Sequence, residues 1–202
     1  MTDQLSYIIE LAGTVAFAMS GSFAAIQHRL DPFGVLIIAF ATAVGGGTVR
    51  DLLLDVPVFW MKDNTTFIVI LCAAILTMIF KSIEKNFKVT LFMFDTLGLG
   101  MFTVIGIEKA IYFGANPMIA ITLGTITGCF GGVLRDILVN RIPLLLRREI
   151  YATACISGGV LYFLLQYATS LNQSLIHLFT VLLIVGIRLA AVKFSWHFKP
   201  VG

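Results

Sequence analysis

Two copies of one short motif hold the residues of this sequence that are best suited to handling ions. Gly46-Gly-Thr-Val-Arg-Asp51 and Gly131-Gly-Val-Leu-Arg-Asp136 each place an Arg-Asp pair after two glycines. Adjacent glycines weaken a helix and ease kinking. Carbonyl groups freed by a break inside a membrane are able to coordinate a cation. The motif therefore predicts ion coordination.

The sequence around these motifs does not indicate an enzyme. Arg-Asp pairs without an activated nucleophile, a histidine dyad or metal-ligand spacing do not form an active site. Gly45-Gly-Gly-Thr48 lacks the lysine of a phosphate-binding loop, and Gly98-Leu-Gly100 lacks the third glycine of a dinucleotide site. We therefore predict no catalytic residues, no cofactor and no metal.

The composition predicts that these residues are carried by membrane-spanning elements. The 202 residues are 58% hydrophobic and 12% charged, with a mean hydropathy of +0.96, whereas soluble domains are roughly 45–50% apolar. The formal net charge of +3 is small, and we predict no nucleic-acid partner. An all-α integral membrane protein in contact with lipids is expected.

Apolar runs of about 20 residues, the length that crosses a bilayer, predict seven transmembrane helices. A β-barrel is disfavoured because runs such as 67–80 are apolar on every face instead of alternating. We treat 1–202 as a single membrane domain. The predicted spans are 5–27, 32–55, 65–82, 89–108, 117–139, 150–168 and 174–192.

An internal repeat organises these spans. An ungapped alignment that places Asp31-Pro32 on Asn116-Pro117 also aligns the two Arg-Asp motifs, and seven of the 24 positions in 31–54 are then identical. We call this alignment the repeat register. Each copy holds three spans, an odd number, so the second copy enters the membrane from the opposite side. The sequence predicts repeat one over 5–82, an inverted repeat two over 89–168, and a seventh helix over 174–192 that has no counterpart.

The distribution of Lys and Arg predicts the orientation. One face carries only Lys62 and Lys109, and the other carries nine basic residues. Cytoplasmic loops are enriched in Lys and Arg, so we expect the N-terminus outside and the C-terminus in the cytoplasm, in the cell (inner) membrane. The nine are Arg29, Lys81, Lys85, Lys88, Arg141, Arg147, Arg148, Lys193 and Lys199.

The glycine motifs allow two interpretations. A broken helix at Gly45-Gly46-Gly47 and at Gly131-Gly132 would expose backbone groups to a conducting pathway. Alternatively, rows of small residues let helices pack closely. The rows are Ala39, Ala43 and Gly47 in the first copy and Gly124, Gly128 and Gly132 in the second.

Ionisable residues within the spans are expected to pair inside the bundle, because a charge at the bilayer centre costs from about 2.5 kcal/mol upward. Matched depth favours the pairs Glu10–Arg50 and Asp95–Arg135, with Arg188 competing for Asp95. Arg50 lies about 27 Å along a straight helix from its start, near the edge of a hydrocarbon core about 30 Å thick. An interfacial arginine is therefore the alternative.

Asp51 and Asp136 directly follow the two arginines. Adjacent residues on a helix do not face each other, so we predict that neither aspartate pairs with its neighbour. Both carboxylates would then remain available to attract cations. The alternative is that both aspartates only brace helix ends.

The two motifs, with Asp95-Thr-Leu-Gly98 ahead of the second, resemble the prokaryotic trimeric intracellular cation (TRIC) channels over nearly the whole chain. The resemblance implies a homotrimer with a pore in each subunit, passing K⁺ and also Na⁺, and a kink at each glycine motif. Phe130 departs from the pattern, since it stands where the first copy has Gly45. The implied pore residues are Gly45, Gly46, Gly47, Arg50, Asp51, Gly131, Gly132, Arg135 and Asp136.

A second function is compatible with the same resemblance. Bacterial relatives are also described as possible glycine transporters, and inverted repeats with broken helices occur in secondary transporters. Transport of a small zwitterion such as glycine is therefore the alternative to a cation channel.

Overall fold

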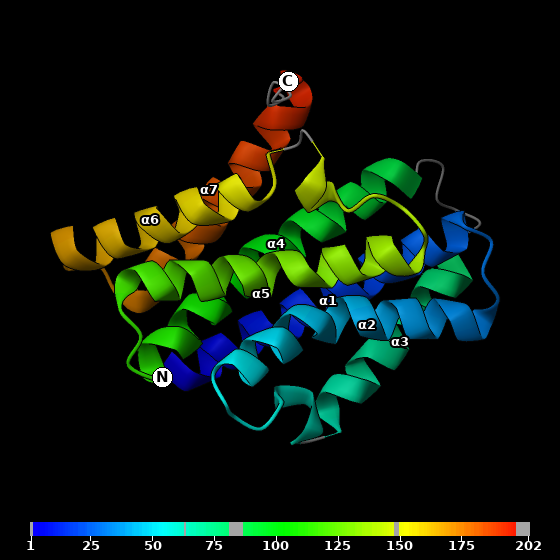
Figure 1. Ribbon diagram of the computed structural model, residues 1–202, viewed down its shortest axis with the longest axis horizontal. Coiled ribbons are helices and arrows are strands. Elements are labelled where there is room, and N and C mark those ends of the chain that lie inside the picture. Colours follow the sequence, from blue (N-terminus) through cyan, green and yellow to red (C-terminus); the bar gives the residue numbers. More distant parts are fainter. Residues whose placement is uncertain (1, 63, 81–86, 148–149, 197–202) are drawn as a thin grey trace.

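The computed structural model describes residues 2–62, 64–80, 87–147 and 150–196. Within these ranges the chain forms seven α-helices and two short 3₁₀ helices, with no strand (Figure 1), which confirms the predicted all-α membrane fold. Residue 82 at the end of repeat one, and Lys81, Lys85, Arg148 and Lys199, lie outside the described residues. The helices are α1 (Thr2–Gln27), α2 (Pro32–Leu53), η1 (Phe59–Met61), α3 (Thr65–Phe80), α4 (Phe87–Tyr112), α5 (Pro117–Leu138), η2 (Leu144–Leu146), α6 (Ala152–Ala168) and α7 (Gln173–Lys193).

The repeat is visible in the helix boundaries. In the repeat register α1, α2 and η1 begin and end at the positions equivalent to those of α4, α5 and η2, respectively. α2 and α5 start in the same way, with an Asx cap followed by proline. Asp31 accepts a hydrogen bond from the Gly34 N–H at 2.7 Å, and Asn116 accepts one from the Ile119 N–H at 3.0 Å.

The helices of the two copies also end alike. α1 and α4 are followed by residues in the left-handed region, Arg29 (φ 58°) and Gly114 (φ 79°). Asp55 (φ 52°) and Asn140 (φ 57°) end α2 and α5 in the same way. This backbone conformation allows the following N–H groups to satisfy the last carbonyls of a helix.

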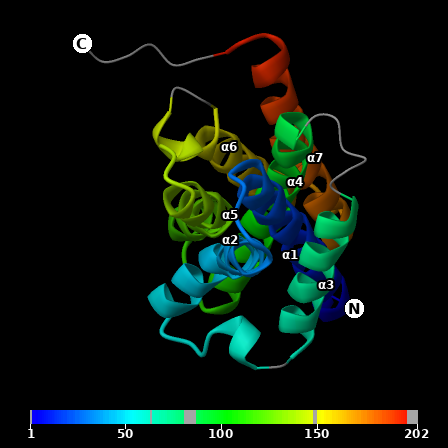
Figure 2. The same cartoon turned by 90° about the vertical axis from the view of Figure 1, so that its right-hand side faces the viewer.

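Four helices form the centre of the molecule, and the others flank it. α1, α2, α4 and α5 pack against one another, α3 covers α1 and α2 on one side, and α6 and α7 lie on the other side against α5 and α4 (Figures 1 and 2). α3 and α6 are shorter than the others, with 16 and 17 residues. α7 packs mainly against α6 and α4, which both belong to repeat two.

The two copies meet at a pair of stacked rings. Phe17 and Phe102, which are equivalent in the repeat register, have ring centroids 5.3 Å apart and planes inclined by 8°. Gly13 lies against Phe102, and Gly98 lies against Phe17. The same contact made in both directions is expected at the axis of an inverted repeat.

The inverted repeat gives the molecule two ends. At the N-terminal end α1, α3, α5 and α7 begin and α2, α4 and α6 finish, and the directions are reversed at the C-terminal end. Many large apolar side chains on the outer helix faces are exposed, among them Phe33, Phe67 and Leu164. This surface suits a helix bundle surrounded by lipid.

Candidate ion pathway

A cluster of four charged residues, two of them fully buried, lies towards the N-terminal end. We call Glu10, Arg50, Asp51 and Lys109 the Arg50 cluster. Arg50 Nε donates to Asp51 Oδ1 at 2.8 Å, and Lys109 Nζ lies 2.7 Å from the same oxygen. Arg50 Nη2 is 3.8 Å from Glu10 Oε1, which confirms the predicted Glu10–Arg50 pair. Arg50 and Asp51 are fully buried, so the Arg50 side chain does not extend to the surface of the subunit.

A second cluster occupies the equivalent position in the other half. We call Asp95, Arg135, Asp136 and Arg188 the Arg135 cluster. Arg135 Nη1 lies 2.5 Å from Asp95 Oδ1 and also donates to Ser20 Oγ at 2.7 Å. Arg188 Nη2 is 3.7 Å from Asp95 Oδ2. Both predicted partners of Asp95 are therefore confirmed.

Each arginine also pairs with the aspartate that follows it, which corrects the prediction that such neighbours do not interact. Arg135 Nε donates to Asp136 Oδ1 at 2.9 Å, as Arg50 does to Asp51. The prediction considered the directions in which side chains leave a helix. The flexible arginine side chain folds back along the last turn of the helix and reaches its neighbour.

The two aspartates are consequently not free carboxylates. Asp51 Oδ2 accepts the Phe59 N–H at 2.8 Å, and Asp136 Oδ2 accepts the Leu144 N–H at 3.0 Å. These amides begin η1 and η2, so each aspartate fastens the 3₁₀ helix to the helix before it. Their first role in this structure is to brace the arginine and the following connection.

The glycine motifs lie in continuous helices. α2 and α5 run through Gly45-Gly46-Gly47 and Gly131-Gly132 without interruption, so a break is absent from this conformation. A Cβ atom on Gly46 would overlap the carbonyl of Thr127, and one on Gly131 would overlap that of Thr42. α2 and α5 therefore cross backbone to backbone at Gly46 and Gly131, a contact that we call the glycine crossing. Gly124 and Gly128 of the predicted small-residue row also lie close to backbone carbonyls of α4, as the close-packing alternative expects.

A cavity of about 440 Å³ lies at the N-terminal end. Its charged lining residues are Glu10, Glu108 and Lys109, with Ser6 and Tyr7 beside them. Two of these, Glu10 and Lys109, belong to the Arg50 cluster. The cavity therefore reaches the buried charges from this end.

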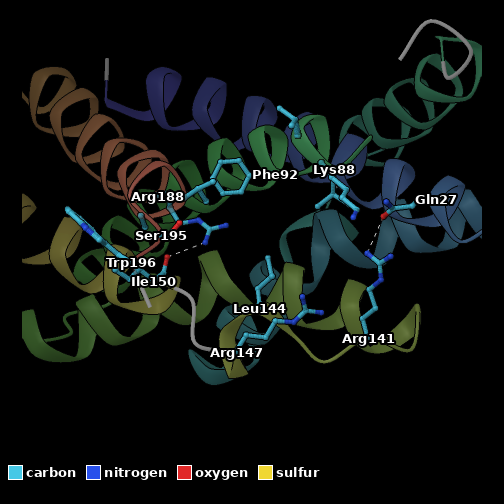
Figure 3. Close-up of a pocket in the computed structure, with 14 residues that line it drawn as sticks. Gln27, Lys88, Phe92, Arg141, Leu144, Arg147, Ile150, Arg188, Ser195 and Trp196 are labelled. Carbon is cyan, nitrogen blue, oxygen red and sulfur yellow. Dashed lines mark hydrogen bonds between the residues drawn. The ribbon is translucent and has the colours of Figure 1, made fainter. Parts of the chain in front are cut away.

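A larger cavity, of about 700 Å³, lies at the C-terminal end (Figure 3). Lys88, Arg141, Arg147 and Arg188 line it, and the described residues around it include no carboxylate. Arg188 belongs to the Arg135 cluster and donates to the Ile150 carbonyl at 3.2 Å. The two cavities thus approach the two clusters from opposite ends.

The sequence-based prediction missed the contributions of Glu108 and Lys109. It ended the fourth span at residue 108 and assigned Lys109 to a loop, whereas α4 continues to Tyr112. Lys109 is within the helix and its ammonium group binds Asp51. The sequence did offer a signal for Glu108 and Lys109, because basic and acidic residues near the end of an apolar helix normally pair when they are buried.

Comparisons with known proteins follow the same pattern. A family model described as "Glycine transporter" matches residues 7–82 and 92–167, one match for each copy of the repeat. The UPF0126 inner membrane protein YadS of Escherichia coli K12 is 43% identical over 197 residues, 96% of this chain and 94% of its own length. A UPF0126 membrane protein of Vibrio cholerae is 42% identical over 98% of this chain and 82% of its own length.

Solved structures of similar proteins share the fold. The TRIC trimeric intracellular cation channel orthologue from Rhodobacter sphaeroides is 33% identical and superposes with a TM-score of 0.89 over 95% of this chain and 98% of its own. A Caenorhabditis elegans trimeric intracellular cation channel, 16% identical with a TM-score of 0.63, shares the fold alone. These neighbours are channels and not enzymes, in agreement with the prediction from the sequence.

Proposed function

We propose that this chain, which belongs to the prokaryotic TRIC and UPF0126 membrane protein family, is a channel for the monovalent cations K⁺ and Na⁺. The observation that carries the proposal is the pair of cavities that approach the buried clusters from opposite ends. The Rhodobacter relative is described as a trimeric cation channel. We therefore propose a homotrimer with one pathway in each subunit.

The proposed pathway runs from one cavity to the other through the glycine crossing. It passes the Arg50 cluster, the crossing of α2 and α5, and the Arg135 cluster. In this conformation the crossing is closed, because helix backbones touch there, so conduction requires α2 and α5 to separate locally. The proposed pathway residues are Gly45, Gly46, Gly47, Arg50, Asp51, Gly131, Gly132, Arg135 and Asp136, with Glu10, Asp95 and Arg188 as their ion-pairing partners.

The clusters support cation passage through their charge balance. Each cluster contains two basic and two acidic side chains. Paired charges are the form in which ionisable groups are tolerated within a membrane. A cation that reaches an opened crossing meets backbone carbonyl groups and carboxylates that are already oriented by their arginines.

We propose that the chain lies in the inner membrane and that its C-terminal end faces the cytoplasm. Five of the nine basic residues counted for this face are described, and the sequence places few at the other end. The positive-inside bias supports this arrangement. The E. coli relative is named an inner membrane protein.

Single-channel recording of the purified protein in asymmetric KCl tests the proposal. Unitary currents that reverse near the K⁺ equilibrium potential are expected. Asp51→Asn should lower the cation current more than Asp136→Asn, because Asp51 neutralises two basic groups at 2.8 and 2.7 Å and Asp136 only one at 2.9 Å. The matched control is Asp31→Asn, since Asp31 only caps α2 and asparagine already serves that role in the second copy.

Two results would contradict this proposal. Folded Asn variants with wild-type K⁺ current and K⁺/Cl⁻ selectivity would remove Asp51 and Asp136 from the pathway. The family model described as a glycine transporter favours the alternative function. Saturable uptake of glycine coupled to an ion, without unitary currents, would identify a transporter.

A further inference from the structure

An acidic and an imidazole side chain form a hydrogen-bonded pair outside the two clusters, near the N-terminal end. His177 Nε2 on α7 lies 2.7 Å from Glu108 Oε1 on α4. The second oxygen of Glu108 accepts a hydrogen bond from Ser6 Oγ on α1 at 2.7 Å. His177 is 2% exposed. The pair therefore ties α7 to the central helices.

The pair has no equivalent at the C-terminal end. The counterpart of Glu108 in the repeat register is Phe23, and α7 stands outside the repeat. Whatever this pair does is therefore confined to one end of the molecule. That asymmetry distinguishes it from the Arg-Asp motifs, which occur at both ends.

The surroundings of His177 hold it in place and fix what Nε2 contacts. The ring stacks on Tyr162 of α6, with centroids 6.1 Å apart, and Gln173 Nε2 lies 3.2 Å from His177 Nε2. A protonated Nε2 donates to Glu108, whereas an unprotonated Nε2 accepts from the Gln173 amide. Nε2 thus has a partner in both of its protonation states, whereas Nδ1 is buried without a hydrogen-bond partner among the described residues.

Glu108 connects this buried imidazole to the N-terminal cavity, which it lines. The other ionisable groups facing the cavity are Glu10 and Tyr7 on α1 and Lys109 and Tyr112 on α4. Tyr162 faces the pair from α6, and Lys109 is bound to Asp51 of α2. Among these described groups His177 is the one imidazole, the side chain that ordinarily exchanges its proton between pH 5 and 8.

We propose that the Glu108–His177 pair is a proton-binding site that sets the charge at the N-terminal mouth of the pathway. With a neutral imidazole and an ionised carboxylate the pair carries one negative charge. Uptake of one proton by the pair removes that charge, whichever of the two groups receives it. The mouth then attracts fewer cations, so acidifying this side lowers the cation current. The inference rests on the proposed channel function.

The test records K⁺ currents from protein in planar bilayers while one compartment at a time is changed from pH 7.5 to pH 5.5. Acidifying the side that the N-terminal end faces is expected to lower the current about twofold, the size expected from losing one charge near the ion's path. Acidifying the other side should not do so. Glu108→Gln should fix the low current at both pH values, and His177→Gln should keep the high current at pH 5.5.

The matched control is His28→Gln, which removes a described imidazole just after α1, at the C-terminal end. It should keep the wild-type response. A second measurement compares the ¹⁵N signal of the His177 imidazole in nanodiscs at pH 7.5 and pH 5.5, and this signal should differ between the wild-type protein and Glu108→Gln.

Each failure has a distinct meaning. Wild-type currents that are equal at both pH values, a full response in Glu108→Gln, or a His177 signal unaffected by Glu108→Gln would overturn the proton site. The absence of current from the wild-type protein at every pH would overturn the channel function itself, and this inference with it.

Discussion

The Arg50 and Arg135 clusters each contain one copy of the repeated motif, but the contacts of the two arginines differ in length. Arg135 Nη1 contacts Asp95 at 2.5 Å and Ser20 at 2.7 Å. The corresponding carboxylate of the other cluster, Glu10, stays 3.8 Å from Arg50. Among the described residues, neither terminal nitrogen of Arg50 has a hydrogen-bond acceptor. The repeat thus sets the position of each arginine without setting its partners.

The substitutions between the copies explain this difference. Ser20, which accepts from Arg135, has Ile105 as its counterpart, and isoleucine offers no acceptor. The Glu10 side chain is 24% exposed towards the N-terminal cavity, whereas Asp95 is fully buried. The contact between the repeated arginine and the acidic residue of the preceding helix is therefore longer in the N-terminal half. The second basic residue differs in the opposite sense, since Lys109 lies 2.7 Å from Asp51 and Arg188 lies 3.7 Å from Asp95.

Double-mutant cycles on the two ion pairs should give the largest difference between the clusters. Arg135→Ala leaves Asp95 and Asp136 without their closest cation, and the expected loss is about 3–5 kcal/mol of unfolding free energy. Adding Asp95→Ala should recover part of it. The same cycle on Arg50 and Glu10 should show a smaller coupling, because the pair is longer and partly solvated. Thermal unfolding in detergent measures both cycles.

Equal coupling energies in the two cycles would contradict the expected difference between the short Arg135–Asp95 pair and the long Arg50–Glu10 pair. Strictly additive effects for Arg135 and Asp95 would show that these two residues do not interact.

Much of this architecture was predictable from the sequence. The repeat register and the depth of each charge were sufficient for the seven helices, for the Glu10–Arg50 and Asp95–Arg135 pairs, and for Arg188 beside Asp95. These features follow from periodicity and from the cost of isolated charges in a membrane. Both can be derived from the order of residues along the chain.

The remaining features depend on packing that the sequence does not display. Helix propensity predicts weakness at Gly45-Gly46-Gly47, but the crossing with α5 holds this segment helical. Pairing of Arg50 with Asp51 depends on how a long side chain folds at a helix end. The Glu108–His177 contact lies between α4 and α7, and α7 has no repeat partner from which its position could be inferred.

The glycine crossing tests whether the two halves are equivalent where they touch. Gly46→Ala and Gly131→Ala each push a methyl group into a backbone carbonyl of the facing helix. Overpacking of this kind costs typically about 1–3 kcal/mol, and a backbone neighbour places these sites at the upper end. Losses of similar size in thermal unfolding would support a symmetric crossing between asymmetric clusters.

Gly186→Ala on α7 is the matched control. Beyond the adjacent backbone of α7, no atom of the described residues lies within 4 Å of an added Cβ there. Replacing a helical glycine by alanine gains up to about 1 kcal/mol. Wild-type stability of Gly46→Ala would mean that α2 and α5 are not in contact at this point in the protein in solution.

The smallest expected effect concerns the hydroxyl that distinguishes the two clusters. Ser20→Ala removes one acceptor from the buried Arg135, which keeps its contacts with Asp95 and Asp136. A loss of about 1 kcal/mol is expected, the typical net value of one hydrogen bond. Ser22→Ala is the matched control, because the Ser22 hydroxyl is equally buried on α1 but donates only to the Ala18 carbonyl of its own helix. If thermal unfolding gives the same loss for both variants, the Ser20 contact does not tighten the Arg135 cluster, and the closer Asp95 carboxylate alone must account for the difference between the two halves.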